Sequence, residues 1–202
     1  MSEYNKLIND INNGKLSPIY LIHGDESFFS DNIINAIIKS SVKDDAADFD
    51  LKKIYSKKSD ENQENEVIDF LKRYPLVGGI NLVIVKDSKN LSNDFLLLTA
   101  YLENLNKKSI LVLSFNQFID KRKKIYKSCL KYGSVFESKK IFDNQVYQWI
   151  EQESKKKLIN LHPSSIKIIA DFVGNDLSQI ENELEKLQLN FNKDQVIGPE
   201  EV

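Results

Sequence analysis

Short apolar runs alternate with longer segments of helical spacing over the first 142 residues of this 202-residue chain. Three runs, residues 18–23, 82–85 and 109–115, are almost wholly apolar, which is typical of strands buried on both faces of a parallel sheet. Weaker runs at 49–55 and 133–137 complete a set of five strands. Because helical segments separate the strands, the pattern predicts an α/β fold: a parallel sheet with helices on both faces.

The first two helical segments have start and stop signals. The first lies within residues 1–15, and Gly14 is its stop signal, since glycine commonly terminates helices. Asp25 suits the N-cap of the second, because a carboxylate there accepts hydrogen bonds from the first turn. The apolar stripe of this second helix consists of Phe29, Ile33 and Ile37, with Ile34 and Ile38 beside them.

Three further helices are expected between the remaining strands. One ends just before Pro75, because proline cannot continue a helix without strain. Another covers about residues 93–105. The last is a basic helix over residues 120–131, with Ile125 and Leu130 as its inward residues.

The pattern changes to helices only from residue 143. Three of them fit in about 50 residues, and Pro163 and Gly174 mark the breaks between them. We therefore expect two domains, residues 1–142 and a three-helix bundle over 143–192. The expected inward residues of the three helices are, in order, Val146, Trp149 and Ile150; Ile166, Ile168, Ile169 and Phe172; and Leu177, Ile180, Leu184 and Leu187.

The last ten residues, 193–202, are expected to begin a further domain. Pro199, Glu200 and Glu201 have the composition of the first turn of a helix, where proline and acidic side chains are favoured. The printed sequence stops as that helix would begin. We therefore expect more sequence beyond it in the natural protein.

Composition argues against several classes of protein. The chain has 28 basic and 30 acidic residues and a net charge of −2, so no overall positive field attracts it to nucleic acid. A single cysteine, Cys129, cannot form an internal disulfide, and with no signal segment visible we expect a cytoplasmic protein. No apolar run approaches the roughly 18 residues of a membrane span. His23, His162 and Cys129 are scattered, so no metal site is expected.

The turn after the first strand lies where a phosphate-binding loop would be. Such a loop needs several glycines, a lysine for the outer phosphates and a Ser or Thr for magnesium. Residues 24–31 contain one glycine, no lysine and the carboxylates of Asp25 and Glu26. We therefore expect no bound nucleotide and no other cofactor, and we interpret both carboxylates as helix caps.

A second interpretation is a receiver-like signalling domain with a magnesium-dependent phospho-acceptor site. Asp25 and Glu26 after the first strand, Asp87 after the third, Ser114 at the end of the fourth and Lys139 after the fifth would gather at the carboxyl edge of the sheet. Polar residues commonly cap strands, however, and a trailing helical bundle is not expected of such a domain. This alternative rests on sheet topology alone.

A short apolar segment, residues 74–77, joins a helix to the third strand, and we call it the tip. Its sequence is Tyr74-Pro75-Leu76-Val77, followed by Gly78 and Gly79. The glycines free the backbone. Apolar side chains in such a place either fold back onto the core or are offered to a partner, and this choice decides the function.

Four consecutive basic residues form a candidate DNA contact: Lys121, Arg122, Lys123 and Lys124. Such a cluster can bind a phosphate backbone. It can equally be a solvated helix face, and without a positive net charge we favour the solvated face.

The order of these segments resembles the delta subunit family of the bacterial clamp loader, within the DNA polymerase III holoenzyme. No single motif is specific, but together the matching segments span nearly the whole chain. They are Pro18-Ile-Tyr-Leu-Ile-His-Gly-Asp-Glu26, Tyr74-Pro-Leu-Val-Gly-Gly79 with the following strand, Asp120-Lys-Arg-Lys-Lys-Ile-Tyr126, Phe172-Val-Gly-Asn-Asp-Leu177 and Glu181-Asn-Glu-Leu-Glu-Lys-Leu187.

The resemblance implies a fold and a role. The fold is an AAA+-like domain with a decayed nucleotide site, a three-helix lid domain and a carboxyl-terminal collar domain. In the family an apolar helix tip inserts into a pocket of the sliding clamp and favours an open ring; the matching residues are Leu76 and Val77, flanked by Tyr74 and Pro75. Val77 departs from the aromatic residue that many relatives carry.

The resemblance also implies partners. They are the sliding clamp, the gamma/tau and delta-prime subunits, and primed DNA within the complex. The chain itself would catalyse no reaction, because its partner subunits would bind ATP.

Overall fold

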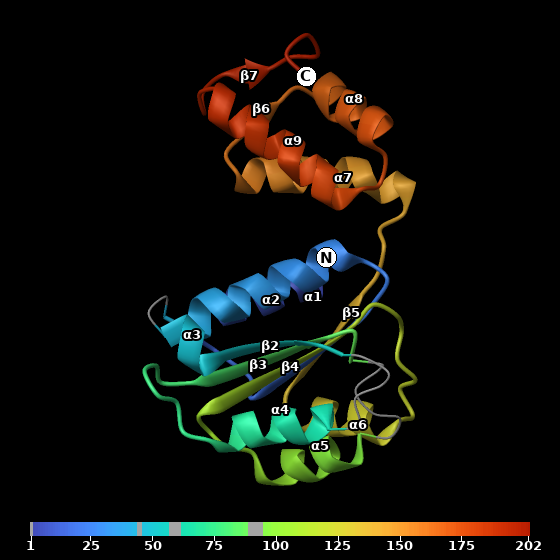
Figure 1. Cartoon of the computed structure of the whole chain (residues 1–202). Coiled ribbons are helices and arrows are strands. Elements are labelled where there is room, and N and C mark those ends of the chain that lie inside the picture. Colours follow the sequence, from blue (N-terminus) through green and yellow to red (C-terminus); the bar gives the residue numbers. More distant parts are fainter. Residues whose placement is uncertain (1, 44–45, 57–61, 89–94) are drawn as a thin grey trace. The chain divides into compact units, whose positions relative to one another are not determined.

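The computed structural model describes residues 2–43, 46–56, 62–88 and 95–202. The chain divides into two compact units, Met1–Lys139 and Lys140–Val202 (Figure 1). Each unit has its own arrangement of helices and strands. Among the described residues, no helix is long and apolar enough to span a lipid bilayer.

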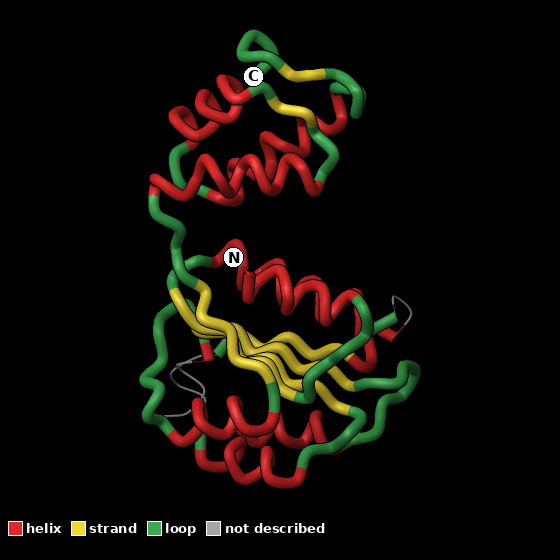
Figure 2. The backbone as a smooth tube through the Cα atoms, turned by 180° about the vertical axis from the view of Figure 1, so that it is seen from behind, coloured by secondary structure: helices red, strands yellow, loops and turns green. Residues whose placement is uncertain are grey.

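The first unit is built on five parallel strands. They are β1 (Ile19–Gly24), β2 (Leu51–Tyr55), β3 (Asn81–Lys86), β4 (Ser109–Phe115) and β5 (Ser134–Ser138), in the spatial order β2-β3-β4-β1-β5. The register places Tyr20 of β1 opposite Val112 of β4 and Ser134 of β5. The predicted parallel α/β sheet is therefore confirmed. Figure 2 shows the strands side by side with helices on both faces.

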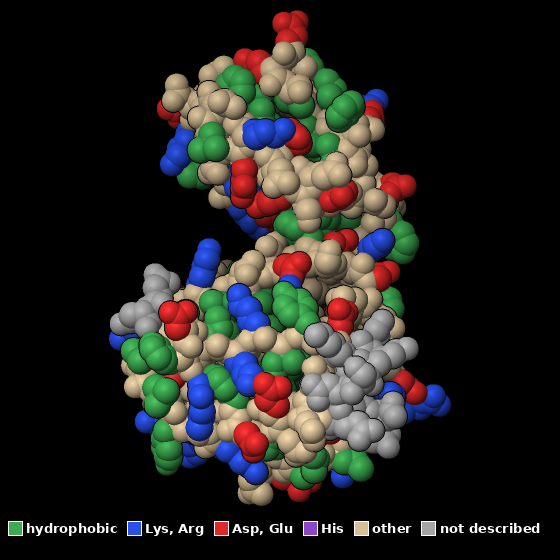
Figure 3. All heavy atoms as spheres, viewed as in Figure 1, with side chains coloured by type: hydrophobic (Ala, Val, Ile, Leu, Met, Phe, Trp, Pro, Cys, Tyr) green, Lys and Arg blue, Asp and Glu red, His purple; other side chains and the backbone are tan. Residues whose placement is uncertain are grey.

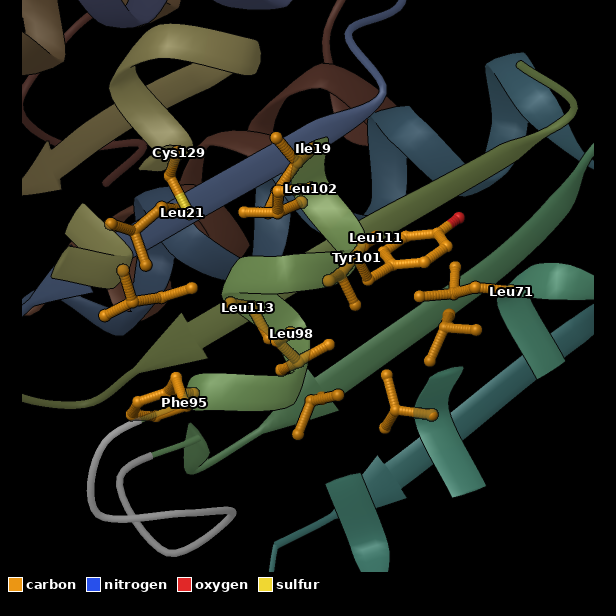
Figure 4. Packing of buried hydrophobic residues seen from close by; sticks show 14 of the residues in the cluster. Ile19, Leu21, Leu71, Phe95, Leu98, Tyr101, Leu102, Leu111, Leu113 and Cys129 are labelled. Carbon is orange, nitrogen blue, oxygen red and sulfur yellow. The ribbon is translucent and has the colours of Figure 1, made fainter. Parts of the chain in front are cut away.

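Two groups of helices cover the two faces of this sheet. One face carries α1 (Ser2–Asn12) and α2 (Ser27–Ser41), and the other carries α4 (Gln63–Lys72), α5 (Leu96–Tyr101) and α6 (Lys124–Tyr132). A short helix, α3 (Ala47–Asp50), leads into β2, and a 3-10 turn, Leu102–Asn104, follows α5. Figure 4 shows the core under the second face, where side chains of the helices meet those of β1 and β4: Leu71, Leu98, Leu102 and Cys129 from the helical side, and Ile19, Leu21, Leu111 and Leu113 from the strands.

Several local predictions for the first unit were wrong. The N-cap of α2 is Glu26, whose Oε1 accepts from the Phe28 N–H at 3.0 Å, and not Asp25. Phe49 lies in α3 and not at the start of a strand. Residues 121–123 precede α6, and the inward partner of Ile125 is Cys129 rather than the exposed Leu130, because side chains four residues apart share a helix face.

The fourth predicted helix, over about residues 93–105, falls partly outside the described residues. Its expected start at Asn93 cannot be compared with the structure, which describes α5 from Leu96.

The second unit contains the three helices that the sequence predicted. They are α7 (Asp143–Lys156), α8 (Pro163–Val173) and α9 (Leu177–Asn190), which pack around the fully buried Trp149, Ile150, Ile180 and Leu184. Phe172 and Ile168 were expected to face inward, but they are 91% and 40% exposed.

Two short strands in the second unit were not predicted. Asn160–Leu161 (β6) and Val196–Ile197 (β7) pair in parallel. The Ile197 side chain is buried, and its carbonyl oxygen accepts from Ser165 Oγ at 2.8 Å. Pro199 and Glu200 form a turn and not the first turn of a helix. Two-residue strands have no periodicity that a sequence can reveal.

Candidate functional site

The tip lies between α4 and β3 with its apolar side chains in solvent. Helix α4 ends at Lys72, and Arg73 takes an extended conformation. The exposed fractions are 76% for Tyr74, 68% for Leu76 and 50% for Val77. Figure 3 shows hydrophobic side chains at the surface of the first unit on the side where α3 lies in Figure 1. Leu76 and Val77 are thus not part of the core.

The backbone of the tip is held by a single buried carboxylate. Asp50, the last residue of α3, is 0% exposed. Its Oδ1 accepts from the Leu76 N–H at 2.6 Å, and its Oδ2 accepts from the N–H groups of Val77 and Gly78 at 2.9 and 2.5 Å. The exposed side chains therefore stand on a backbone with a defined shape.

The charge of Asp50 is stabilised in place. Burial alone would raise the pKa of this carboxyl group, but the N–H groups of Gly78, Leu76 and Val77 and the positive charge of Arg73 outweigh it, so the pKa lies below its ordinary value. Asp50 is consequently ionised at neutral pH, when it can accept all three hydrogen bonds.

Polar side chains at the start of β3, and at and just before the start of β4, fix the base of the tip. The last carbonyl groups of a helix have no partner within the helix. Here Ser109 Oγ and Asn106 Nδ2 donate to the Leu71 carbonyl at 2.6 and 2.9 Å, and Asn81 Nδ2 donates to the Arg73 carbonyl at 2.6 Å. The end of α4 is thus tied to the starts of β3 and β4.

Arg73 joins the tip to α3 a second time. Its guanidinium lies over the Phe70 ring, 3.6 Å from the centroid, and its Nη2 donates to the Phe49 carbonyl. The Phe49 side chain is 50% exposed. Two consecutive residues of α3 therefore contact the segment that carries the tip, one through its side chain and one through its backbone.

The turn after β1 uses its backbone N–H groups within the fold. The N–H groups of Asp25 and Glu26 donate to the Ser138 carbonyl at 2.9 and 3.3 Å, and that of Gly24 donates to the Gln117 carbonyl at 3.2 Å. A Cβ atom on Gly24 would lie 1.8 Å from the Ser138 oxygen. These N–H groups, which would cradle phosphate in a nucleotide-binding loop, are instead bonded to β5 and to the loop after β4.

The receiver-like alternative does not fit the strand order. In that fold β1 lies beside β3, in the order 2-1-3-4-5. Here β4 separates β1 from β3, and Asp87 accepts from Asn116 Nδ2 at 2.5 Å. Within the described ranges, no three His, Cys, Asp or Glu side chains gather in a way that could hold a metal ion. The phospho-acceptor interpretation is therefore not supported.

The four basic residues lie in and just after the turn before α6. Lys121 Nζ pairs with Glu137 at 2.7 Å, and the Arg122 guanidinium makes a two-point contact with Asp120, whose pKa it lowers to about 2. Lys123 precedes α6 and Lys124 is its first residue. Two of the four charges are thus balanced by neighbouring carboxylates, which weakens their attraction for phosphate.

Sequence reasoning identified the tip but missed Asp50 and Phe49 as parts of the site. Both residues fall in the run 49–55, which the sequence predicts to be a strand. Asp50 lies 26 residues before Leu76 in the sequence, and nothing in either segment alone indicates that they meet.

Comparisons with known proteins show the family and the fold of the chain. Residues 20–139 match the family model described as DNA polymerase III, delta subunit. A curated relative, DNA polymerase III subunit delta of Bacillus subtilis (strain 168), is 21% identical over 184 residues, which cover 86% of this chain and 52% of the relative. The chain therefore spans about half the length of the curated relative it matches.

Two solved structures share the fold. The Bacillus subtilis DNA clamp loader delta protein (YqeN) matches with a TM-score of 0.83 at 20% identity, covering 98% of this chain and 61% of that one. A gamma subunit-related protein of DNA polymerase III from Thermotoga maritima matches with a TM-score of 0.52 at 13% identity, covering 90% and 57%. Since the family model covers more than half of the sequence, the chain belongs to the DNA polymerase III delta subunit family.

Proposed function

We propose that this chain is the clamp-binding part of a clamp-loader delta subunit, and that it holds the sliding clamp through Leu76 and Val77. The observation that carries the proposal is an apolar tip whose side chains are exposed while its backbone is fixed by Asp50. Exposed apolar residues on an ordered backbone are typical of a surface that a partner covers. The similarity in fold to the Bacillus subtilis DNA clamp loader delta protein supports the same role.

The energy available from the tip sets the size of the interface. Burying a Leu or Val side chain contributes about 1.5–3 kcal/mol. Two such residues give at most about 6 kcal/mol, and a micromolar complex needs about 8 kcal/mol. Tyr74 and other exposed residues near the tip must therefore add contacts, with Leu76 and Val77 as the anchors.

Opening of the clamp needs no chemistry in this chain. A protein that binds the open ring more tightly than the closed ring shifts the population toward the open form by its difference in affinity. We therefore assign no catalytic residue here. Nucleotide would be bound by the gamma/tau subunits, which with delta-prime and primed DNA complete the proposed assembly.

The test replaces the anchors. We expect Leu76→Ala with Val77→Ala to weaken binding of the sliding clamp from the same cell by about tenfold or more, measured by titration calorimetry. The melting temperature should stay the same, because neither side chain is buried in the free chain.

A matched control removes the same two side-chain types elsewhere. Leu189 and Val196 are exposed in the second unit, and Leu189→Ala with Val196→Ala should leave clamp affinity unchanged. Equal affinity of the tip variant and the parent would refute the proposal. A large drop in melting temperature would instead place the tip in the core.

A further inference from the structure

Three successive N–H groups, two from the tip and one from the glycine that follows it, converge on one carboxylate. Leu76, Val77 and Gly78 donate to Asp50 over 2.5–2.9 Å. Consecutive backbone N–H groups that point to one place form a concave anion site. In this chain the anion is a side chain from another element, and it is completely buried.

The other hydrogen bonds described above act at the base of the tip, on Leu71 and Arg73, and not on Leu76 and Val77. The side chains of the tip are largely in solvent, and two glycines follow directly. Fixing the backbone of one residue costs about 1–2 kcal/mol of conformational entropy. A tip that was already ordered before the partner arrived would bind more tightly, since this cost would not fall on the binding step.

Gly78 shows that the contact is closely fitted. A Cβ atom at this position would lie 3.2 Å from Asp50 Oδ2 and 3.3 Å from the Ala46 Cβ. The carboxylate and the start of α3 therefore approach the backbone where a residue without a side chain leaves room.

We infer that Asp50 is a positioning residue for the tip: its carboxylate holds Leu76 and Val77 in the conformation that binds the clamp. This inference rests on the proposed function. Asp50 itself is buried and would not touch the clamp, so it acts through the tip backbone.

The test uses Asp50→Asn, which keeps the shape of the side chain. An amide has one acceptor oxygen in place of two, and its nitrogen donates, so the three N–H groups cannot all be satisfied. We expect clamp affinity to fall by about fivefold or more. In the free variant, hydrogen exchange at the amides of Leu76, Val77 and Gly78 should rise by about tenfold, while that of Val112 in β4 stays the same.

A matched control separates positioning from charge. Asp48 is exposed on the same short helix, so Asp48→Asn removes an equal charge and leaves the tip bonds intact. It should bind the clamp as the parent does. If Asp48→Asn weakened binding as much as Asp50→Asn, the effect would be electrostatic and the inference would fail.

A double-mutant cycle tests whether Asp50 affects clamp binding through the side chains of the tip. In the background of Leu76→Ala with Val77→Ala, Asp50→Asn should cause no further loss of affinity, because the side chains that it positions are gone. A full additional loss in that background would overturn the inference.

The two proposals can fail separately. If the tip variant weakens binding and Asp50→Asn does not, the inference is wrong and the proposed function stands. If the tip variant binds as the parent does, the proposed function is wrong. Should Asp50→Asn fail to fold, Gly78→Ala strains the same contact from the tip side and should weaken binding as well; unchanged affinity of that variant would overturn the inference.

Discussion

Phe49 is an exposed aromatic residue of α3, and the residue after it, Asp50, holds the backbone of a tip that has a valine at its second apolar position. Phe49 also accepts a hydrogen bond from Arg73, at the base of the tip, through its carbonyl oxygen. Half of its surface is exposed. Val77 supplies less apolar surface than an aromatic residue would, so an additional ring from α3 would add apolar surface to the proposed interface anchored by Leu76.

We expect Phe49→Ala to weaken clamp binding by roughly three- to tenfold, which corresponds to about 0.7–1.4 kcal/mol. Titration calorimetry measures the affinity, and thermal unfolding should show little change because the side chain is half in water. Phe172→Ala is the matched control, since Phe172 is an exposed phenylalanine of the second unit. Equal losses in both variants would argue against a role for Phe49.

Among the helices and strands, the best predictions were those for the central strands. β1, β3 and β4 are buried along nearly their whole length. A strand that is buried on both faces needs a continuous apolar run, and such runs are directly visible in the sequence. β2 lies at the edge of the sheet and is partly exposed, so its pattern was weaker and its start was misplaced.

The contacts that build the site could not be predicted from the sequence, for a physical reason. The order β2-β3-β4-β1-β5 depends on how the strands pair, and no local pattern encodes it. The bond from Asp50 to Leu76 joins two segments 26 residues apart. The tip itself could be predicted because its signal is local: apolar residues, a proline and two glycines in six positions.

The close approach of β1 to β5 gives a test of packing between strands. Gly24 pairs with Ser138, has a φ of 141°, and leaves no room for a Cβ atom beside the Ser138 carbonyl. We expect Gly24→Ala to lower the free energy of unfolding by more than about 3 kcal/mol in urea titrations, because the two backbones must move apart.

Gly14→Ala separates backbone strain from the clash. Gly14 also has a positive φ, 75°, but nothing lies within 4 Å of a Cβ atom there. Its replacement should therefore cost only the strain of the left-handed conformation, about 1–2 kcal/mol. A Gly24→Ala loss no larger than that of Gly14→Ala would show that the strands adjust without cost.

The chain as a whole consists of two units with separate cores. The first places the tip at one end of a sheet whose core is independent of the exposed residues, so the tip can change without loss of the fold. The second has its own buried cluster around Trp149, which is the only tryptophan of the sequence. Tryptophan emission therefore reports on unfolding of the second unit alone, whereas circular dichroism reports on unfolding of both units.

We expect the two units to unfold in separable steps. Leu111→Ala removes a fully buried side chain of β4 and should destabilise the first unit by about 2–5 kcal/mol. The part of the circular dichroism transition that belongs to the first unit should move to a lower urea concentration. The midpoint of the Trp149 emission transition should not move. Ile180→Ala, at a fully buried position of α9, should do the reverse and lower the emission midpoint. A shift of the Trp149 midpoint in the Leu111→Ala variant would mean that the two cores unfold as one cooperative unit.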